Sequence, residues 1–379
     1  MQRPSHRTTL VALVGMVAAT AAGSASGQGV LLPLGSNPDE GLTASRTLVA
    51  HTREGSVLHV YEAAFRWSGP DVGGFVWVVP VGDEASLASV DCAVFDELEN
   101  LAAPRILVQH RGPADGCGCD EWDPQQAESS PIGSHVWPED TLAGAASGPE
   151  GFATWEDLLA RLAAMGVEAQ SGLAAEVLGY YVANGYSFLF SEVDGHEAEG
   201  AVCLAVRYPS STAYLLPMRS AAVAADGLVE ILIYVLDEMR VEPPANGSPY
   251  PAVEIAPDAI RLADGGTTNY QTLFEDAVHV DAPPEVRRNF VVEFSGNVGP
   301  VGMIEPAHEW LTRLRTTLPG REIISDVPLE QVQEGAEVRR DRTILVASAG
   351  RAPGAETVLA LTAFGICLVA RGRRRRSPR

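Results

Sequence analysis

The sequence contains no lysine, and its 27 basic residues are all arginine. We interpret this as a bias of base composition, which excludes no function. The short motifs of common enzyme sites are also missing: the G-x-S-x-G of hydrolases, the G-x-x-x-x-G-K-[ST] phosphate loop, a G-x-G-x-x-G after a strand and the zinc-binding H-E-x-x-H. Their absence argues against common hydrolases, nucleotide triphosphatases and zinc peptidases. No cofactor is predicted.

Positive charge is scarce and gathers at the two ends of the chain. Against 49 acidic residues there are 27 arginines, which leaves a formal net charge of −22. Eight of the arginines lie within the first seven and the last nine residues, so the part between them is still more acidic. A surface this acidic repels nucleic acid and anionic lipid, and we therefore expect no nucleic-acid partner.

Residues 1–25 have the layout of a secretory signal peptide. Arg3 and Arg7 precede an apolar stretch that ends at Ala22, and small residues then allow cleavage after Ala25, with Gly27 as the second choice. The alternative is an uncleaved membrane anchor, for which the apolar stretch is short. We expect the protein to be exported across the inner membrane.

A second apolar segment, Thr357–Ala370, is followed directly by an arginine cluster. It is shorter than the ~20 residues that span a bilayer, but the arginines act as a stop-transfer signal and keep this end in the cytoplasm. We interpret residues 356–379 as a membrane anchor with an Arg-rich tail. The arrangement resembles bacterial sorting tails of the PEP-CTERM kind. The alternative is a buried core helix with a solvated basic tail.

The body, residues 45–350, follows an irregular entry segment at 26–44. We predict an α+β fold with mainly antiparallel sheets and packed amphipathic helices, because strands and helices come in runs. Its centre is the apolar run 74–81, whose length is typical of a strand buried on both faces. The alternating run 56–67 predicts its hairpin partner, and a helix over 92–102 packs on this pair.

The rest of the body is predicted from shorter signals. The polar connection 112–151 offers a boundary between two subdomains. Thr154 and Asp157 form a capping box that starts a helix. Further helices are expected from Ser171, from Thr268 with Gln271 as its capping partner, and from Pro306. Strands are expected at 46–51, 105–110, 186–193, 201–208, 213–217, 228–236 and 290–294, with 186–193 and 201–208 joined as a hairpin.

Several motifs in this order resemble one known family. They are Trp67-Ser-Gly-Pro, Phe75-Val-Trp-Val-Val-Pro-Val, Val94-Phe-Asp-Glu-Leu, Ala103-Pro-Arg, Tyr214-Leu-Leu-Pro-Met-Arg, Ile231-Leu-Ile-Tyr-Val-Leu and Leu311-Thr-Arg-Leu-Arg-Thr-Thr-Leu. The chain is similar over about residues 45–330 to the uncharacterised bacterial family known as domain of unknown function 2330. The resemblance implies an exported protein, often with a C-terminal tether, and it implies no activity and no site residues.

Four cysteines of the body are candidates for disulfides: Cys92, Cys117, Cys119 and Cys203. An oxidising compartment favours their pairing, and four thiols allow three connectivities. A bond between Cys117 and Cys119 would strain the geometry of so short a loop. We therefore expect each of these two to pair with Cys92 or Cys203.

The alternative use of these thiols is a metal site. His110, Cys117, Cys119 and Asp120 are ligands that zinc accepts, although C-x-C departs from the common C-x₂-C spacing. His196, with Glu192, Asp194, Glu197 and Glu199, is a weaker cluster that we interpret as a charged hairpin tip, because EF-hand spacing is missing. We interpret His59, Phe75, Trp67 and Trp77 as core residues. No catalytic residue is predicted.

These observations favour a membrane-tethered protein of the cell envelope. Its α+β body would face outward and bind or scaffold a partner without catalysing a reaction. The alternative is an extracytoplasmic, hydrolase-like enzyme with a metal site in the 110–120 loop.

Overall fold

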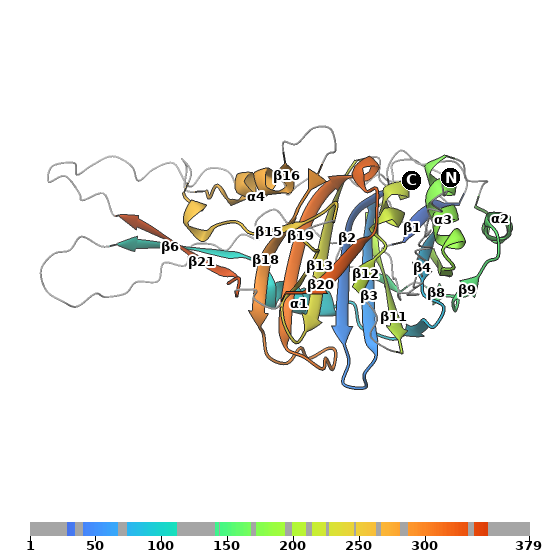
Figure 1. Ribbon diagram of the computed structural model, residues 1–379, viewed down its shortest axis with the longest axis horizontal. Coiled ribbons are helices and arrows are strands. Elements are labelled where there is room, and N and C mark those ends of the chain that lie inside the picture. Colours follow the sequence, from blue (N-terminus) through green and yellow to red (C-terminus); the bar gives the residue numbers. More distant parts are fainter. Residues whose placement is uncertain are drawn as a thin grey trace, which may run out of the picture.

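The computed structural model describes residues 29–34, 41–66, 74–111, 141–143, 145–167, 172–193, 199–209, 214–224, 227–245, 248–262, 267–280, 287–332 and 337–347. Four layers follow one another along the long axis of the body (Figure 1). Helices α1 (Val94–Ala102) and α4 (Tyr270–Val278) cover one face of a nine-stranded sheet. A five-stranded sheet packs on the other face, and two further helices cover its outer side.

The nine-stranded sheet is mainly antiparallel, and the helices are few, which confirms the α+β class. Among the described strands of this sheet, parallel pairing occurs only at β13–β2, β15–β18 and β11–β7. The strands are, in spatial order, β15 (Ala252–Val253), β18 (Phe290–Asn297), β19 (Trp310–Pro319), β13 (Leu228–Asp237), β2 (Leu42–His51), β3 (Val57–Arg66), β11 (Glu199–Tyr208) and β5 (Ser86–Ala88), with β7 (Thr141–Ala143) beside β11.

Strand β4 (Phe75–Val81) lies inside the five-stranded sheet and is buried along its whole length. Phe75 and Trp77 enter the core between the two sheets, while Val76 and Val78 enter the core beneath the outer helices. The prediction of a strand buried on both faces is therefore confirmed. The other strands of this sheet are β1 (Val30–Pro33), β10 (Ser187–Val193), β8 (Ala145–Ala146) and β9 (Glu150–Gly151).

Two predicted hairpins are wrong. Strand β4 pairs with β1 and β10, whereas β3 pairs with β2 and β11. The consecutive strands β10 and β11 likewise belong to different sheets. In both cases the chain crosses from one sheet to the other, so the earlier strand pairs with other strands rather than with the next one along the sequence. Strand β1 also lies in the segment that we predicted to be irregular.

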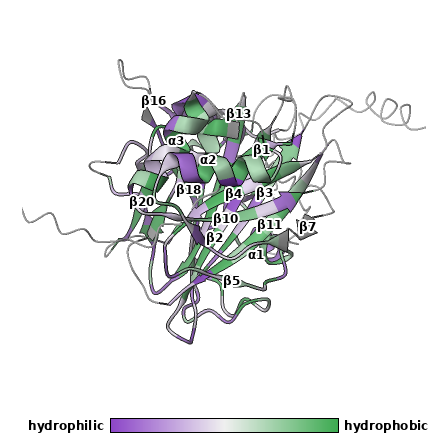
Figure 2. Cartoon of the chain, turned by 90° about the vertical axis from the view of Figure 1, so that its right-hand side faces the viewer, coloured by the Kyte–Doolittle hydropathy of each residue, from purple (hydrophilic) through white to green (hydrophobic). Residues whose placement is uncertain are grey.

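Helices α2 (Trp155–Ala164) and α3 (Leu173–Ala183) cover β4 and β10 (Figure 2). The capping box of α2 is present: the Thr154 hydroxyl accepts from the Asp157 amide, and the Asp157 carboxylate accepts from the Thr154 amide. Helix α4 begins after Asn269 without a side-chain cap, so the capping box that we predicted at Thr268 is wrong.

The helix predicted from Pro306 is also wrong, because Trp310–Pro319 is strand β19. Leu311, Leu314 and Leu318 have helical spacing, yet Leu314 and Leu318 face the core between the sheets while Leu311 faces α1. Arg313 and Arg315 lie between these leucines and are also buried. A strand whose arginines are buried loses the alternation of apolar and solvated residues by which strands are recognised.

Shorter elements complete the fold. Strands β12 (Tyr214–Leu216), β20 (Val327–Gln331) and β14 (Val241–Glu242) form a three-stranded sheet. Two-stranded sheets pair β16 (His279–Val280) with β17 (Arg287–Arg288), and β6 (Arg105–Arg111) with β21 (Asp341–Ala347). The short helical turns are η1 (Met218–Ala224), η2 (Pro257–Ala259) and η3 (Gly320–Glu322).

The predicted signal peptide (1–25) and membrane anchor (356–379) lie outside the described residues. Within the described ranges, no helix has both the length and the apolar character needed to cross a membrane.

Gly29 provides a test of how tightly β1 is packed against β4. Its φ is +77°, and an added Cβ would lie 2.2 Å from Nε1 of Trp77. We expect Gly29→Ala to lower the free energy of unfolding by about 2–5 kcal/mol, from overpacking and from the positive φ together. Gly55→Ala is the matched control, because its φ is +79° but no atom lies within 4 Å of the added Cβ. Urea unfolding measures the free energy of unfolding of both variants. Equal losses in Gly29→Ala and Gly55→Ala would contradict the Trp77 contact.

Candidate functional site: a cavity and a charge network around helix α1

A cavity of about 220 Å³ opens at the end of the nine-stranded sheet where β2 turns into β3. The turn supplies Thr52, Arg53 and Glu54, and the adjoining strands supply Ala50 and Leu58. The second wall is the segment 89–90, and the third is the loop 303–306. Apolar side chains therefore lie beside charged ones, a composition that suits the binding of a small amphiphilic group.

The loop 303–306 is held in place by hydrogen bonds from its main-chain amides and those of its neighbours. The Ala307 amide donates to the His51 carbonyl at 2.6 Å, which joins the loop to the end of β2. From the other side, the carboxylate of Glu97 on α1 accepts from the amides of Gly302 at 2.7 Å and Met303 at 3.2 Å. Helix α1 thus positions one wall of the cavity.

A disulfide between Cys92 and Cys203 fixes the second wall. Cys92 lies two residues before α1 and two after Val90, while Cys203 belongs to β11, the strand that also carries Arg207 of the cavity. The prediction that these two cysteines pair with Cys117 and Cys119 is wrong, because they bond to each other. The cause is the position of α1, which crosses the sheet next to β11 and brings Cys92 within reach of Cys203.

Three polar side chains of the cavity have partners. Arg207 pairs with Glu54, and the Thr52 hydroxyl bonds to Ser56. His308 lies nearby, with its Nε2 3.7 Å from Oε1 of Glu238. No nucleophile with an adjacent base is found among the described lining residues.

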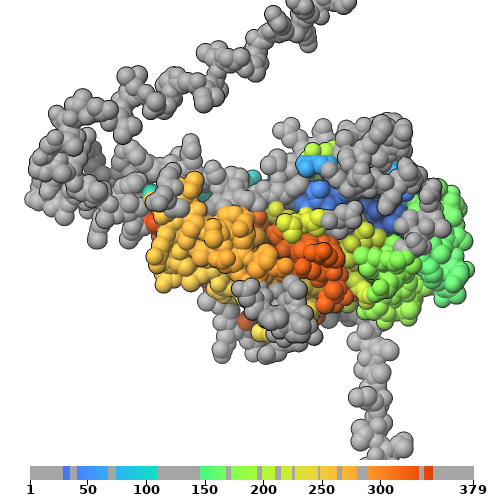
Figure 3. All heavy atoms as spheres, turned by 90° about the horizontal axis from the view of Figure 1, so that it is seen from above, coloured from blue at the N-terminus to red at the C-terminus, as the bar shows by residue number. Residues whose placement is uncertain are grey.

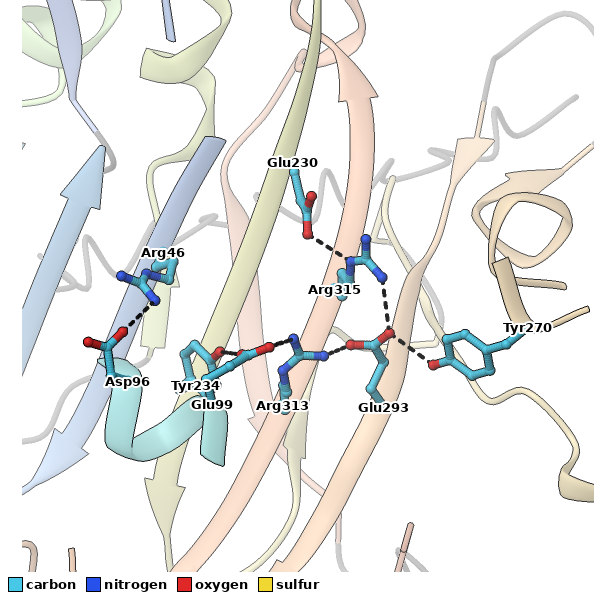
Figure 4. A network of polar contacts seen from close by, with 9 residues as sticks. All are labelled: Arg46, Asp96, Glu99, Glu230, Tyr234, Tyr270, Glu293, Arg313 and Arg315. Carbon is cyan, nitrogen blue, oxygen red and sulfur yellow. Dashed lines mark hydrogen bonds and ion pairs between the residues drawn. The ribbon is translucent and has the colours of Figure 1, made fainter. Parts of the chain in front are cut away.

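Behind the cavity, buried charges cross the nine-stranded sheet under α1 and α4 (Figure 4). Glu99 on α1 accepts two hydrogen bonds from Arg313, both at 3.0 Å, and one from the Tyr234 hydroxyl. Arg313 also pairs with Glu293 of β18. The Glu293 carboxylate in turn accepts from the Tyr270 hydroxyl of α4 at 2.9 Å. One chain of contacts therefore joins both helices to the sheet.

Two more arginines extend this network. Arg315 pairs with Glu230 at 2.8 Å and lies 3.5 Å from Glu293, and its guanidinium stacks over Phe274 of α4. Arg46 pairs with Glu62 of the neighbouring strand and lies over the ring of Phe95 on α1. Guanidinium groups suit this position because they pair with carboxylates and stack on rings at the same time.

Burial and pairing shift the pKa values of the network. Burial acts to raise the pKa of Glu99, but the charge of Arg313 and the hydrogen bonds from Tyr234 and Arg313 outweigh it and hold that pKa below its usual range. Burial raises the pKa of Tyr234 and of Tyr270. The carboxylate is thus ionised and the phenols are neutral at physiological pH. These groups are enclosed and mutually paired, so we assign the network a structural role.

The other predicted site residues are not brought together in the described part of the chain. His110 lies on β6, while Cys117, Cys119 and Asp120 lie outside the described residues. His196, Asp194 and Glu197 also lie outside, and Glu192 and Glu199 belong to different sheets. Among the described residues, no group of His, Cys, Asp or Glu is arranged to hold a metal ion.

Sequence reasoning missed the network entirely. None of its members was predicted to be a buried charge, yet Glu293, Arg313 and Arg315 are each no more than 2% exposed. The available signal was the spacing of Arg313 and Arg315, which places both on one face of a strand. The predicted helix at this segment hid that signal.

His59 is confirmed as a core residue. It lies between the two sheets, 3.0 Å from the Tyr61 hydroxyl through Nδ1, with the Tyr208 ring against its edge. Burial, with a smaller contribution from His51, lowers its pKa to about 3. Phe75 and Trp77 are core residues as predicted, and Trp67 lies outside the described residues.

The chain is similar to one family of bacterial proteins. Residues 36–326 match a family described as "Uncharacterized protein conserved in bacteria (DUF2330)". No curated protein matches the chain. Among solved structures, the crystal structure of baculovirus P35 matches with 10% sequence identity and a TM-score of 0.33, covering 80% of this chain and 99% of that chain. A TM-score this low gives no information on fold or function.

The network predicts a large effect for a single substitution. Arg313→Met removes the closest charged partner of the buried Glu293 carboxylate, and we expect a loss of about 3–5 kcal/mol in the free energy of unfolding. Arg66→Met is the control, because the Arg66–Glu199 pair is about half exposed and such pairs contribute about 0–1 kcal/mol. Similar losses in the two variants, measured by urea unfolding, would disprove the structural role of the network.

His59 predicts a pH dependence of stability. Below the ordinary histidine pKa of 6.5, His59 is protonated in the unfolded chain, whereas in the folded chain it stays neutral down to about pH 3. As the pH is lowered through this window, the free energy of unfolding should therefore decrease, by up to about 1.4 kcal/mol per pH unit from His59. His59→Gln should flatten the slope between about pH 6 and pH 4, whereas His308→Gln, partly exposed, should keep it. An unchanged slope in His59→Gln would contradict the neutral buried histidine.

Proposed function

Because the chain belongs to the DUF2330 family of uncharacterised proteins conserved in bacteria, we propose a function from its own sequence and geometry. The protein is an exported component of the cell envelope, tethered to the membrane through residues 356–379. Its α+β body binds or scaffolds a partner and catalyses no reaction.

Export is supported above all by the Cys92–Cys203 disulfide. Disulfides of this kind persist in oxidising compartments and are rare in the reducing cytoplasm. The bond closes a long loop, with a sequence separation of 111 residues between its ends, and joins the start of α1 to a strand of the main sheet. The signal-like segment at residues 1–25 gives the route by which the chain would reach such a compartment.

A binding role is supported by the cavity beside α1. Its walls are pinned by a disulfide, by Glu97 and by the β2–β3 turn, which preorganises the opening. Preorganisation favours binding, because less conformational freedom is lost when a partner is taken up. In the lining, the Glu54 carboxylate pairs with Arg207 and the Thr52 hydroxyl bonds to Ser56.

The proposal predicts where the chain is found and in which redox state. We expect the full chain to sediment with membranes and a version ending at Arg351 to be released into the soluble envelope fraction. In both, intact mass after alkylation should show Cys92 and Cys203 protected until a reductant is added. A third version starting at Ser26 should stay in the cytoplasm with both thiols alkylated. Membrane binding of the Arg351 version would refute the tether, and a cytoplasmic full chain would refute export.

One observation favours a second candidate function. Since Cys92 and Cys203 bond to each other, neither is available to Cys117 or Cys119. The thiols of the 110–120 loop therefore lose the partners that we predicted, and the alternative of an enzyme with a metal site there gains support.

Metal analysis of the purified body tests this alternative. A stoichiometric zinc content that is lost in Cys117→Ser/Cys119→Ser and retained in Cys92→Ser/Cys203→Ser would establish the metal site. The Cys92→Ser/Cys203→Ser variant is the control, because loss of the disulfide should lower the free energy of unfolding by about 2–5 kcal/mol without changing the metal content. Absence of bound metal in the wild-type protein, purified without chelator, would exclude this candidate.

A further inference from the structure

Strands β6 and β21 form a two-stranded ribbon that leaves the body at one end of its long axis (Figure 1). Helices α2 and α3 lie at the other end, and the view from above in Figure 3 likewise separates the α4 region (orange) from α2 and α3 (green). The two strands are parallel, with Arg105 opposite Asp341 and Arg111 opposite Ala347. Both therefore run outward, and their last residues lie together at the tip.

The base of this ribbon is firmly attached to the body. Arg340 donates to the carbonyls of Asn100 and Leu101 at the C-terminal end of α1. Arg342 is 4% exposed and donates to the Ile255 carbonyl at 2.8 Å. Ile106 belongs to the core beneath α4, where Ile344 packs against it. These contacts set the direction in which the ribbon leaves the body.

The ribbon and its base are rich in arginine, unlike the body as a whole. Residues 105–111 and 339–347 carry five arginines and one acidic residue, in a protein with a net charge of −22. Arg339 is 79% exposed at the base of the ribbon and makes only a loose pair with Glu337 at 3.8 Å. Basic surface next to a membrane segment is attracted to anionic lipid, and the acidic body is repelled by it.

The position of β21 in the chain points to the same end. Ala347 closes the last described strand, and nine residues separate it from Thr357, the first residue of the apolar segment. Even fully extended, that connection reaches at most about 35 Å. The tip of the ribbon is the part of the body to which the apolar segment is most closely linked.

We propose that the β6–β21 ribbon is the membrane-facing surface of this protein and contacts anionic lipid headgroups, while α2 and α3 point away. This inference rests on the proposed tether. It also implies that Arg111, which is paired with Ala347 at the tip, lies on the membrane side.

Energy transfer in lipid nanodiscs tests the orientation. The full chain is reconstituted with headgroup-labelled acceptor lipid, and a donor dye is introduced as a non-natural amino acid at Thr343 on the ribbon or at Glu156 on α2, both of them exposed. We expect transfer from Thr343 to exceed transfer from Glu156 several-fold in anionic discs. Arg339→Glu should narrow this difference, whereas the control Arg321→Glu on the exposed turn η3 should not.

The outcomes separate this proposal from the tether on which it rests. If the chain co-purifies with the discs but Glu156 transfers as much as Thr343, or neither site transfers, the membrane-facing ribbon is refuted and the tether stands. If the difference in energy transfer between Thr343 and Glu156 is as large in zwitterionic discs, and in the Arg339→Glu variant, as in the unchanged chain in anionic discs, the lipid-headgroup contact is refuted. If the chain does not co-purify with discs at all, the tether itself fails, and the inference falls with it.

Discussion

The pairing of buried arginines with buried carboxylates is the constraint on which this structure depends. Arg313 and Glu293 are almost completely removed from water, and an isolated ion at either position would be strongly unfavourable. Each therefore requires the other, and Glu99 accepts from Arg313 while Tyr270 donates to Glu293. Because these partners come from α1, β18, β19 and α4, the network specifies how the helices sit on the sheet rather than simply adding stability.

Helix α1 connects this buried layer to the surface cavity. Its first turn follows Cys92, which is bonded to β11, and Glu97 holds the loop that forms a wall of the cavity. Two residues further, Glu99 enters the charge network. Its C-terminal carbonyls accept from Arg340, at the base of the ribbon. A short helix thus links the cavity, the disulfide, the network and the ribbon, so a displacement of α1 would affect all of them together.

The sequence predicted those features whose cause is local. The capping box at Thr154 and Asp157, the burial of β4 on both faces and the α+β class follow from patterns within a few residues. Strand β19 shows the limit of this approach: buried arginines replaced the solvated positions of the usual alternation, and the leucines that remained had helical spacing. The candidate site was not predictable, because its walls come from segments as far apart as 50 and 306.

By itself, the sequence determined the strongly acidic body, the apolar segments at both ends and the family to which the chain belongs. It also specified which runs would be buried, because burial follows from side-chain chemistry. Only the tertiary structure decided which strands pair, that Cys92 meets Cys203, and that charged side chains lie inside. The physical reason is that strand pairing, disulfide bonding and ion pairing each need two groups distant in the chain. Local sequence describes each group alone, and only the folded core brings the partners together.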